Sequence, residues 1–196
     1  ALERISREIG SEMVMNVLVI TGSPHRTGTS ALMAEKFIEG ASEMGAQINR
    51  FDAAFANVHP CIGCDVCHCG ENKCVFDDDM MSLYPKIQDA DIIVYISPLY
   101  YHNISAQMKA VIDRYRGIDD LIRHKPKKVL SIITAAYPED WVFDGVKAVI
   151  KTTTRYLGWK DCGGIYAFDC YKREDIEKTT YPKKAFELGM HIKEID

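Results

Sequence analysis

The sequence predicts a doubly wound α/β fold, in which helices cover both faces of a parallel β-sheet. Short apolar runs alternate along the chain with longer segments whose apolar residues recur at helical spacing. At least three of these runs are almost continuously apolar, which is typical of strands buried on both faces. The chain has 196 residues, of which 47% are hydrophobic and 27% charged. This length and composition suit one large domain with its own core.

The chain begins with residues 1–14, where three apolar residues lie at helical spacing. We expect a peripheral extension here, attached to a single domain that spans residues 15–196. The first strand is expected at Met15–Thr21, because this run is apolar and rich in β-branched residues. The first helix is expected at Ser30–Met44, which has one apolar face and stops before Gly45.

The second strand is expected at Gln47–Asp52, and the helix that follows it at Asp77–Gln88. That helix opens with Asp77, Asp78 and Asp79, and carboxylates favour a helix N-terminus. Helix capping is favoured over a divalent-metal site, because three adjacent carboxylates point in different directions.

The remaining elements continue the alternation. Strands are expected at Asp91–Ser97, Lys127–Thr134 and Gly164–Phe168, and helices at Ser105–Tyr115, Trp141–Leu157 and Pro182–Ile195. Five strands that alternate with five helices predict right-handed crossovers, with a ligand site at the carboxyl ends of the strands. The segments that follow the strands are therefore the candidate binding loops.

Charge and hydropathy exclude two classes of partner. The net charge of −4 argues against nucleic acid, whose binding depends on clustered Lys and Arg. The basic run Arg123–Lys128 has no second basic block to support it and is interpreted as a solvated turn. The longest apolar runs are far shorter than the ~18 residues that a membrane span needs. No secretion signal is recognisable, so we expect a cytoplasmic protein.

The cysteines indicate metal or redox chemistry. There are seven, and five of them lie between Cys61 and Cys74. A secreted disulfide framework is usually even in number and spread along the chain. Clustered thiols in a reducing cytosol indicate a metal or redox site instead. Cys162 and Cys170 are remote from this cluster, and we expect them to be inert.

The loop after the first strand, Gly22–Ser30, has the composition of an anion cradle. A helix N-terminus offers unpaired N–H groups and partial positive charge, which suit a phosphate. The loop is neither a P-loop nor a Gly-x-Gly-x-x-Gly dinucleotide loop. The alternative is that its hydroxyls only cap the helix. The candidate contacts are Gly28, the hydroxyls of Ser23, Thr27, Thr29 and Ser30, and a cation from His25 or Arg26.

The loops after the third and fourth strands add aromatic and small residues. In Ser97–Ser105, a proline, two tyrosines and an asparagine suit the flat wall that an aromatic heterocycle needs. Small residues in Ser131–Tyr137 would let the backbone approach a ligand closely. Ordinary packing of the loops on the core is the alternative. An anion site beside an aromatic wall fits a phosphorylated aromatic cofactor.

Several motifs together are similar to one family over nearly the whole chain, from Met15 to about Met190. They are Gly22-Ser23-Pro24 with Gly28-Thr29-Ser30, Cys61-Ile62-Gly63-Cys64 with Asp78-Asp79-Met80, Ser97-Pro98-Leu99-Tyr100-Tyr101, Ser105-Ala106-Gln107-Met108-Lys109 with Asp113-Arg114, and Leu157-Gly158-Trp159-Lys160. On these residues the chain resembles the flavodoxin-like NAD(P)H-dependent FMN reductases, including the iron–sulfur flavoproteins.

The resemblance implies a flavodoxin-like three-layer sandwich with strand order 2-1-3-4-5 and FMN at the switch point. It implies that Ser23, Thr27, Thr29 and Ser30 hold the FMN phosphate. Family members often carry arginine directly after the Ser-Pro pair, whereas this chain has His25 there and Arg26 next. Either cation would therefore meet the phosphate. The isoalloxazine ring is implied to lie against Pro98, Leu99, Tyr100, Tyr101 and Asn103, with Thr134, Ala135 and Tyr137 on another side.

The cysteine segment, an insertion at residues 60–75, offers four thiolates with the spacing Cys61-x2-Cys64-x2-Cys67-x6-Cys74. Closely spaced C-x2-C-x2-C runs are the bacterial ferredoxin pattern, and the fourth spacing resembles that of the iron–sulfur flavoproteins. Three alternatives stay open: a [4Fe–4S] cluster, a zinc ion held by four thiolates, and free thiols without metal. Cys69 is a spare thiol.

The preferred hypothesis is an oxidoreductase in which electrons pass from NAD(P)H through FMN to a small acceptor such as a quinone, a flavin, an azo compound or iron. This scheme needs no general base, so no catalytic residue is assigned, and Tyr100 and Tyr101 are expected to guide the substrate. The alternative is an iron–sulfur flavoprotein or flavodoxin-like carrier that exchanges electrons with a ferredoxin-type partner. A zinc-stabilised module without flavin is a third hypothesis. The resemblance also implies a homodimer or homotetramer.

Overall fold

A computed structural model describes residues 14–69 and 73–195 of the chain. At its centre is a five-stranded sheet in which every pair of neighbouring strands is parallel. The strand order β2-β1-β3-β4-β5 confirms the expected order 2-1-3-4-5. The strands are β1 (Asn16–Thr21), β2 (Gln47–Asp52), β3 (Ile92–Pro98), β4 (Lys128–Thr134) and β5 (Lys160–Ala167).

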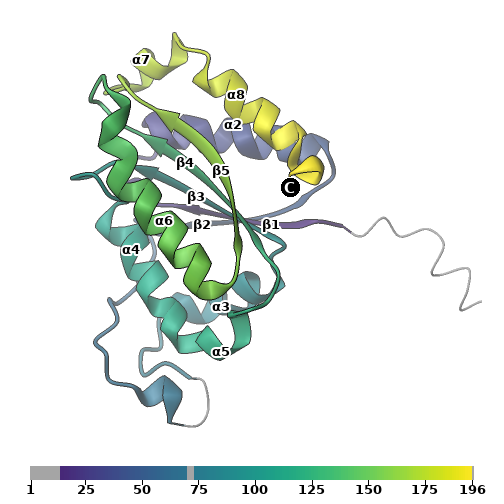
Figure 1. The fold of residues 1–196 in the computed structure, drawn as a ribbon, viewed down its shortest axis with the longest axis vertical. Helices are drawn as coiled ribbons and strands as arrows, with labels where there is room; N and C mark the ends of the chain where they lie inside the picture. Colours follow the sequence, from purple (N-terminus) through teal and green to yellow (C-terminus); the bar gives the residue numbers. More distant parts are fainter. Residues whose placement is uncertain (1–13, 70–72, 196) are drawn as a thin grey trace, which may run out of the picture.

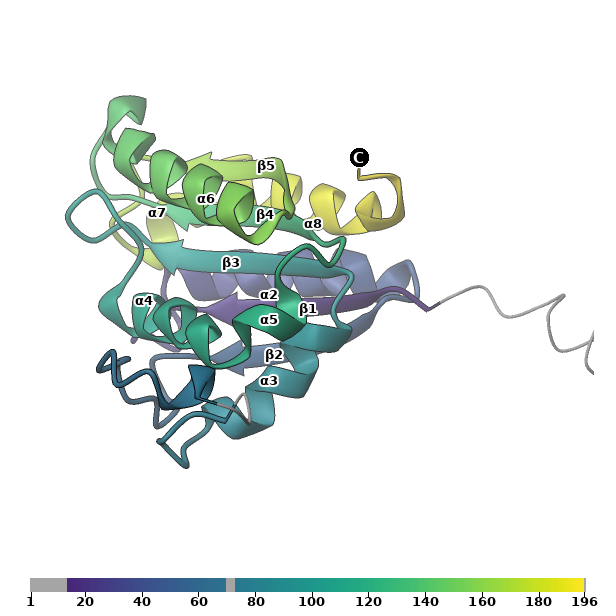
Figure 2. The same ribbon diagram turned by 60° about the horizontal axis from the view of Figure 1, so that its bottom comes forward.

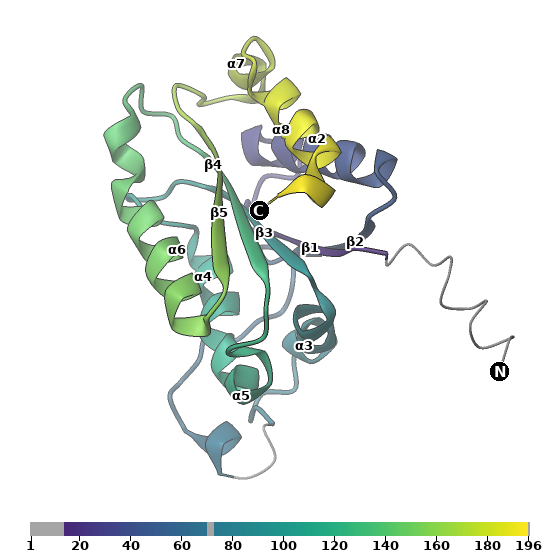
Figure 3. The same ribbon diagram turned by 45° about the vertical axis from the view of Figure 1, so that its right-hand side comes forward.

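Helices cover both faces of the sheet, so the three-layer sandwich is confirmed (Figures 1 and 3). One face carries α2 (Thr29–Glu43), α7 (Arg173–Glu177) and α8 (Tyr181–Met190). The other carries α3 (Met80–Asp89), α4 (Ala106–Asp113), α5 (Asp119–Ile122) and α6 (Asp144–Leu157). Short 3-10 segments are η1 (Val66–His68), η2 (Arg114–Ile118), η3 (Asp140–Phe143) and η4 (Ile192–Glu194).

Alternate residues of the central strands supply two separate cores. In β1, Leu18 and Ile20 belong to the core beneath α3, α4 and α6, whereas Val17 and Val19 belong to the core beneath α2. All four side chains are buried, which explains the continuous apolar run in the sequence. Because the strands are parallel, the loops that follow them emerge at one edge of the sheet, toward which the arrows in Figure 2 point.

The last strand is longer than predicted. It begins at Lys160 rather than Gly164. The sequence did not predict these first residues as strand, because they are largely exposed at the edge of the sheet and show no apolar pattern. The register also shifts between Val129 and Ser131 of the neighbouring strand. Gly164 lies opposite this irregularity with a φ of 152°, and a Cβ there would lie 1.8 Å from the carbonyl oxygen of Ser131.

Several helix boundaries also differ from the prediction, because helix ends often tighten into 3-10 turns. The helix expected from Trp141 is α6, which begins at Asp144 after η3, and the helix expected to end at Tyr115 ends at Asp113 and continues as η2. The closing helix ends at Met190 and is followed by η4. The sequence reading missed α5 and α7, whose four and five residues are too short for a periodic pattern.

None of the described helices has both the length and the apolar character needed to cross a membrane. Of the extension expected at residues 1–14, only Val14 lies within the described residues. The expectation for residues 1–13 therefore lies outside the part of the chain that the structure describes.

Candidate functional site

The loops after β1, β3 and β4 meet at the carboxyl edge of the sheet. The N–H of Gly22 donates to the carbonyl of Ile96 over 2.8 Å, and the N–H of Leu99 donates to that of Thr134 over 2.7 Å. A Cβ on Gly22 would lie 2.5 Å from the Oγ of Ser105, so a glycine is needed for this close approach. The fold thus brings the three predicted binding loops together.

Hydroxyls from α2 and from the end of β4 gather at the N-terminus of α2. The Oγ1 of Thr134 lies 3.0 Å from the Oγ1 of Thr29 and 2.8 Å from the Oγ of Ser30. The residue at the N-cap position of α2 is Gly28, which has no side chain to cap the first turn. Thr29 and Ser30 therefore direct their hydroxyls to Thr134, and within the described residues no side-chain hydrogen bond caps α2. The first turn keeps the N–H groups and partial positive charge that suit an anion.

The two candidate cations of the first loop have different surroundings. The Oγ of Ser23 accepts the N–H of His25 over 3.2 Å, which closes the loop around Pro24. The guanidinium of Arg26 lies over the ring of Phe55, 3.7 Å from its centroid, and this contact ties Arg26 to the loop after β2. Both cations border a hollow of about 140 Å³ that Ser23 and Phe55 also line. Sequence reasoning had not selected Phe55, because a lone aromatic in a loop carries no signal.

A strained turn follows β3. Tyr100 and Asn103 each donate a backbone N–H to the other's carbonyl, over 2.9 and 3.1 Å. Between them, Tyr101 and His102 have φ values of 47° and 63°, which are costly for residues with a side chain. The Tyr101 side chain is fully exposed, and the Oδ1 of Asn103 is occupied by the N–H of Ile104 at 2.8 Å. Strain of this kind clusters at ligand-binding sites.

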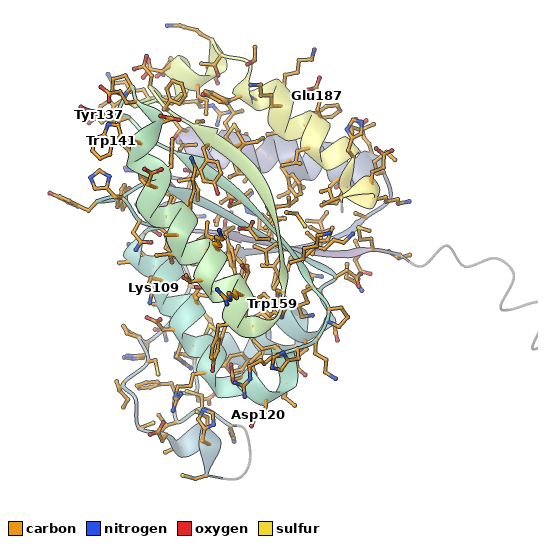
Figure 4. The ribbon with its side chains drawn as sticks, in the orientation of Figure 1. Lys109, Asp120, Tyr137, Trp141, Trp159 and Glu187 are labelled. Atoms are coloured by element: carbon orange, nitrogen blue, oxygen red, sulfur yellow. The ribbon has the colours of Figure 1, made fainter. Side chains whose placement is uncertain are left out.

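His102 joins the loop after β3 to the loop after β4. Its ring stacks on Trp141 with centroids 5.2 Å apart, and its Nδ1 lies 3.3 Å from the carbonyl oxygen of Val142. Tyr137 meets Trp141 edge-on, with centroids 5.7 Å apart, and Figure 4 shows these two rings side by side. The aromatic residues border an open pocket of about 570 Å³.

Only part of the predicted ring site lines this pocket. Leu99, Tyr101, Ala135 and Tyr137 do, whereas Pro98, Tyr100, Asn103 and Thr134 are not among its lining residues. Sequence reasoning missed His102 and Trp141 as site residues. The sequence pattern places Trp141 in a helix. The contact between His102 and Trp141 depends on the approach of two loops that are far apart in the sequence.

A buried ion pair holds the two ends of the cysteine segment together. Arg114 donates to the carboxylate of Asp78 over 2.6 and 3.1 Å, and the two side chains are only 1% and 2% exposed. Arg114 also donates to the carbonyl of His59 over 2.8 Å, while Asp78 accepts the N–H of His59 over 3.0 Å. The His59 ring stacks on Phe76 with centroids 4.7 Å apart. Residues 60–75 therefore leave and rejoin the domain at one neck.

The prediction that Asp77–Asp79 cap a helix is confirmed for Asp78. One of its oxygens does accept the N–H of Met80, the first residue of α3, over 3.1 Å. The same carboxylate also forms the buried ion pair with Arg114, which the sequence does not reveal. Burial acts to raise the pKa of Asp78, but the hydrogen bonds from Arg114, His59 and Met80 outweigh burial and lower it.

The four cysteines of the spacing pattern line one cavity of about 20 Å³. Cys61, Cys64, Cys67 and Cys74 share it with Arg114 and Arg116, among other residues. All four are free thiols, and burial raises the pKa of the Cys67 thiol. Among residues 14–69 and 73–195, no three His, Cys, Asp or Glu side chains are gathered closely enough to hold a metal ion. The donor chemistry fits a soft metal, although the sulfur atoms are not converged as ligands.

The other thiols have separate surroundings. The Sγ of Cys69 donates to the carbonyl of Asp65 over 3.3 Å, and Cys69 does not line the cavity of the other four cysteines. Cys170 is buried, and this burial raises its pKa to about 11, which agrees with the expected inert thiol.

Comparison with known sequences identifies one family. The family model described as NADPH-dependent FMN reductase matches residues 15–141. An iron–sulfur flavoprotein of Methanocaldococcus jannaschii is 35% identical over 104 residues, which are 53% of this chain and 53% of that protein. An iron–sulfur flavoprotein of Methanosarcina thermophila is 34% identical over 100 residues, covering 51% and 52% of the two chains. The chain thus spans about half the length of the curated relatives it matches.

Solved structures share the fold over almost the whole chain. An NAD(P)H:quinone oxidoreductase from Methanothermobacter marburgensis has a TM-score of 0.72 at 20% identity, covering 91% of this chain and 96% of that chain. An FMN-dependent NADH-azoreductase from Bacillus anthracis, solved in complex with FMN, has a TM-score of 0.63 at 15% identity, covering 90% and 98%. At these identities the likeness establishes the flavodoxin-like fold alone.

Proposed function

This chain belongs to the NADPH-dependent FMN reductase family, and on that premise we propose that it is an FMN-dependent oxidoreductase acting on NAD(P)H. The observation that carries the proposal is an anion site next to an aromatic pocket at one edge of the sheet. The anion site is the first turn of α2 with the hydroxyls of Thr29, Ser30 and Thr134. The pocket begins at Leu99, whose backbone N–H bonds to Thr134 itself.

FMN combines a phosphate and a planar ring, which are the two chemistries that these neighbouring sites offer. In this proposal the phosphate accepts N–H groups of α2 beyond Gly28 and the hydroxyls of Ser23, Thr27, Thr29 and Ser30, with positive charge from His25 or Arg26. The ring lies against Pro98, Leu99, Tyr100, Tyr101 and Asn103, with Thr134, Ala135 and Tyr137 on another side. FMN would supply the transfer of electrons from NAD(P)H, and the protein orients both molecules.

We propose that the electron acceptor shares the aromatic pocket with the flavin ring, on the side of His102 and Trp141. None of the pocket's lining residues carries a carboxylate, ammonium or guanidinium group, and Tyr137 and Trp141 offer exposed ring surface. Such a lining favours an uncharged planar molecule, because an anion would lose hydration without gaining a partner. Two structural neighbours are named as a quinone oxidoreductase and an azoreductase, which supports this choice.

The test is to purify the chain, record its absorption spectrum and follow NADH and NADPH oxidation with a naphthoquinone. We expect a yellow protein that retains FMN and turns over in the presence of the quinone. A protein that keeps FMN but oxidises NAD(P)H no faster than free FMN would instead be an electron carrier. A colourless protein that takes up no added FMN would end the proposal.

A second candidate function rests on the cysteine segment. Four thiols line one cavity together with two arginines, an arrangement that suits an anionic metal–thiolate centre. In this alternative Cys61, Cys64, Cys67 and Cys74 hold a [4Fe–4S] cluster, and the chain exchanges single electrons with a ferredoxin-type partner. The curated relatives named as iron–sulfur flavoproteins support it. Anaerobic purification followed by iron and sulfide assays tests it, and a yellow protein without iron or sulfide would exclude the cluster.

The proposal extends to the assembly and location of the protein. We expect a homodimer or homotetramer in the cytoplasm, which the family resemblance favours. Light scattering on the FMN-loaded protein measures the assembly, and a monomeric mass would contradict it.

A further inference from the structure

The guanidinium of Arg114 has one nitrogen that the buried ion pair does not use. One terminal nitrogen donates to Asp78 and to the carbonyl of His59, and the other donates to Asp78. The Nε is buried and has no hydrogen-bond partner. Within the described residues, no other buried side-chain nitrogen or oxygen lacks a partner. A buried donor without an acceptor destabilises the protein, so this nitrogen calls for an acceptor.

The position of Arg114 indicates where that acceptor lies. Arg114 lines the same cavity as the four cysteines of the segment. The other arginine of this cavity, Arg116, is about half exposed and is already paired with Asp65. Arg114 is therefore the buried donor beside the thiols. The carboxylate of this cavity, that of Asp65, is already paired with Arg116, so a deprotonated sulfur is the charged acceptor that remains.

The geometry fixes Arg114 independently of any ligand. Its ion pair with Asp78 is bidentate, and its second acceptor is the backbone at the neck of the segment. The ring of Phe76, at the other side of the neck, lies 5.1 Å from the guanidinium carbon. A side chain held by so many contacts is already oriented before a ligand arrives, which avoids the entropic cost of ordering it.

We propose that Arg114 is a positioning residue for a metal centre formed by Cys61, Cys64, Cys67 and Cys74, to which its Nε–H donates a hydrogen bond. Four thiolates carry more negative charge than one Zn²⁺ neutralises, so a zinc centre is anionic, and a cluster held by four thiolates also gains from a charge-assisted donor. Such a bond outside the ligand set orients the ligands and tunes the metal. The inference rests on the second candidate function and not on FMN binding.

The first test measures metal binding to the full-length chain. Zn²⁺ affinity is measured by competition with a chromophoric chelator. The amounts of iron and sulfide bound per chain are measured after anaerobic reconstitution with Fe²⁺ and sulfide. Arg114→Lys keeps a positive charge near Asp78 but removes the Nε donor. We expect it to lower Zn²⁺ affinity at least tenfold, to halve iron uptake or more, and to shift the midpoint potential of any remaining cluster to more negative values.

The matched control is Arg123→Lys. Arg123 is also ion-paired, but its partner is Asp119, and both residues lie outside the cysteine segment. We expect its metal binding to equal that of the unaltered chain. FMN retention and the thermal midpoint, measured on all three proteins, report folding. Metal uptake by Arg114→Lys equal to the control would overturn the proposal.

A second measurement is made on the unaltered chain. In the unaltered chain labelled with ¹⁵N-arginine, Zn²⁺ should shift one Nε–H resonance and slow its exchange with solvent, and Arg114→Lys assigns that resonance if it folds. Unchanged arginine resonances would overturn the proposal, and so would a chain that binds neither Zn²⁺ nor iron. A chain that oxidises NAD(P)H but takes up neither Zn²⁺ nor iron would end this inference and leave the proposed function standing. Metal uptake by a chain that binds no FMN would end the proposed function and leave this inference standing.

Discussion

The hydroxyl of Ser30 in the first turn of α2 lies 2.8 Å from the hydroxyl of Thr134 at the end of β4. The two residues are 104 positions apart in the sequence. Their contact joins the anion site to the strand whose following loop lines the aromatic pocket. A substitution of Ser30 or Thr134 therefore alters the proposed cofactor site where the anion site meets the aromatic pocket.

Removing the Thr134 hydroxyl should weaken FMN binding moderately. Thr134→Val deletes the partner of both Thr29 and Ser30, and each lost hydrogen bond is worth about 1 kcal/mol. We expect the Kd for FMN to rise about 5- to 10-fold, measured by quenching of flavin fluorescence. Thr154→Val is the control, because Thr154 is also buried but its hydroxyl bonds only within α6. An unchanged Kd in Thr134→Val would show that these hydroxyls do not shape the phosphate site.

A negative charge at the start of α2 should strongly weaken FMN binding without unfolding the protein. In Thr29→Glu the carboxylate competes with the phosphate, while the same charge stabilises a helix N-terminus by about 0.3–1 kcal/mol. We expect at least a ~100-fold loss of FMN affinity, equivalent to about 2.7 kcal/mol, and an equal or higher thermal midpoint. Thr29→Gln separates size from charge and should lose much less. Tight FMN binding by Thr29→Glu would mean that the phosphate lies elsewhere.

Truncating Trp141 should affect the acceptor more than the cofactor. Trp141 lines the pocket and supports His102 and Tyr137, and an aromatic pair is worth about 0.5–1.5 kcal/mol beyond its buried area. In Trp141→Ala we expect the KM for a naphthoquinone to rise about 3- to 10-fold, with little change in KM for NAD(P)H. Steady-state kinetics measure both. Tyr156→Ala removes another exposed aromatic, on α6, and serves as the control. Equal effects of the two changes would remove the pocket from the acceptor site.

The buried ion pair should make stability depend on acidic pH. The pKa of Asp78 is lowered in the folded state, so its contribution is complete above the ordinary carboxyl pKa of about 4 and is lost as the pH falls through the folded value. Asp78→Asn leaves Arg114 without its charge partner and should lower the free energy of unfolding by about 3 kcal/mol at neutral pH. Urea denaturation between neutral and acidic pH measures both effects.

Asp77→Asn is the control for the ion pair, since it removes one carboxylate from an exposed position in the same segment. We expect it to change stability by less than about 0.5 kcal/mol. The loss of stability in acid should be smaller in Asp78→Asn than in the unaltered chain, because the titrating group is gone. If both variants lose stability in acid equally, other carboxylates dominate the pH dependence.

The sequence by itself determined the architecture and the location of the binding loops. Buried parallel strands must be apolar on both faces, so runs such as Val17–Ile20 identify strands without any tertiary information. The alternation of strands and helices then places every following loop at one edge. Local patterns also predicted the hydroxyl-rich loop before α2 and the clustered thiols of the cysteine segment.

Only the tertiary structure decided which side chains meet. Three contacts show this: Ser30 with Thr134, Asp78 with Arg114, and His102 with Trp141. The first two join residues 104 and 36 positions apart, and the third joins the loop after β3 to the loop after β4. No local pattern encodes such pairs, because their distance depends on how the whole chain crosses the sheet. The same cause hid the second role of Asp78, whose carboxylate caps α3 as the sequence indicates and is also the buried partner of Arg114.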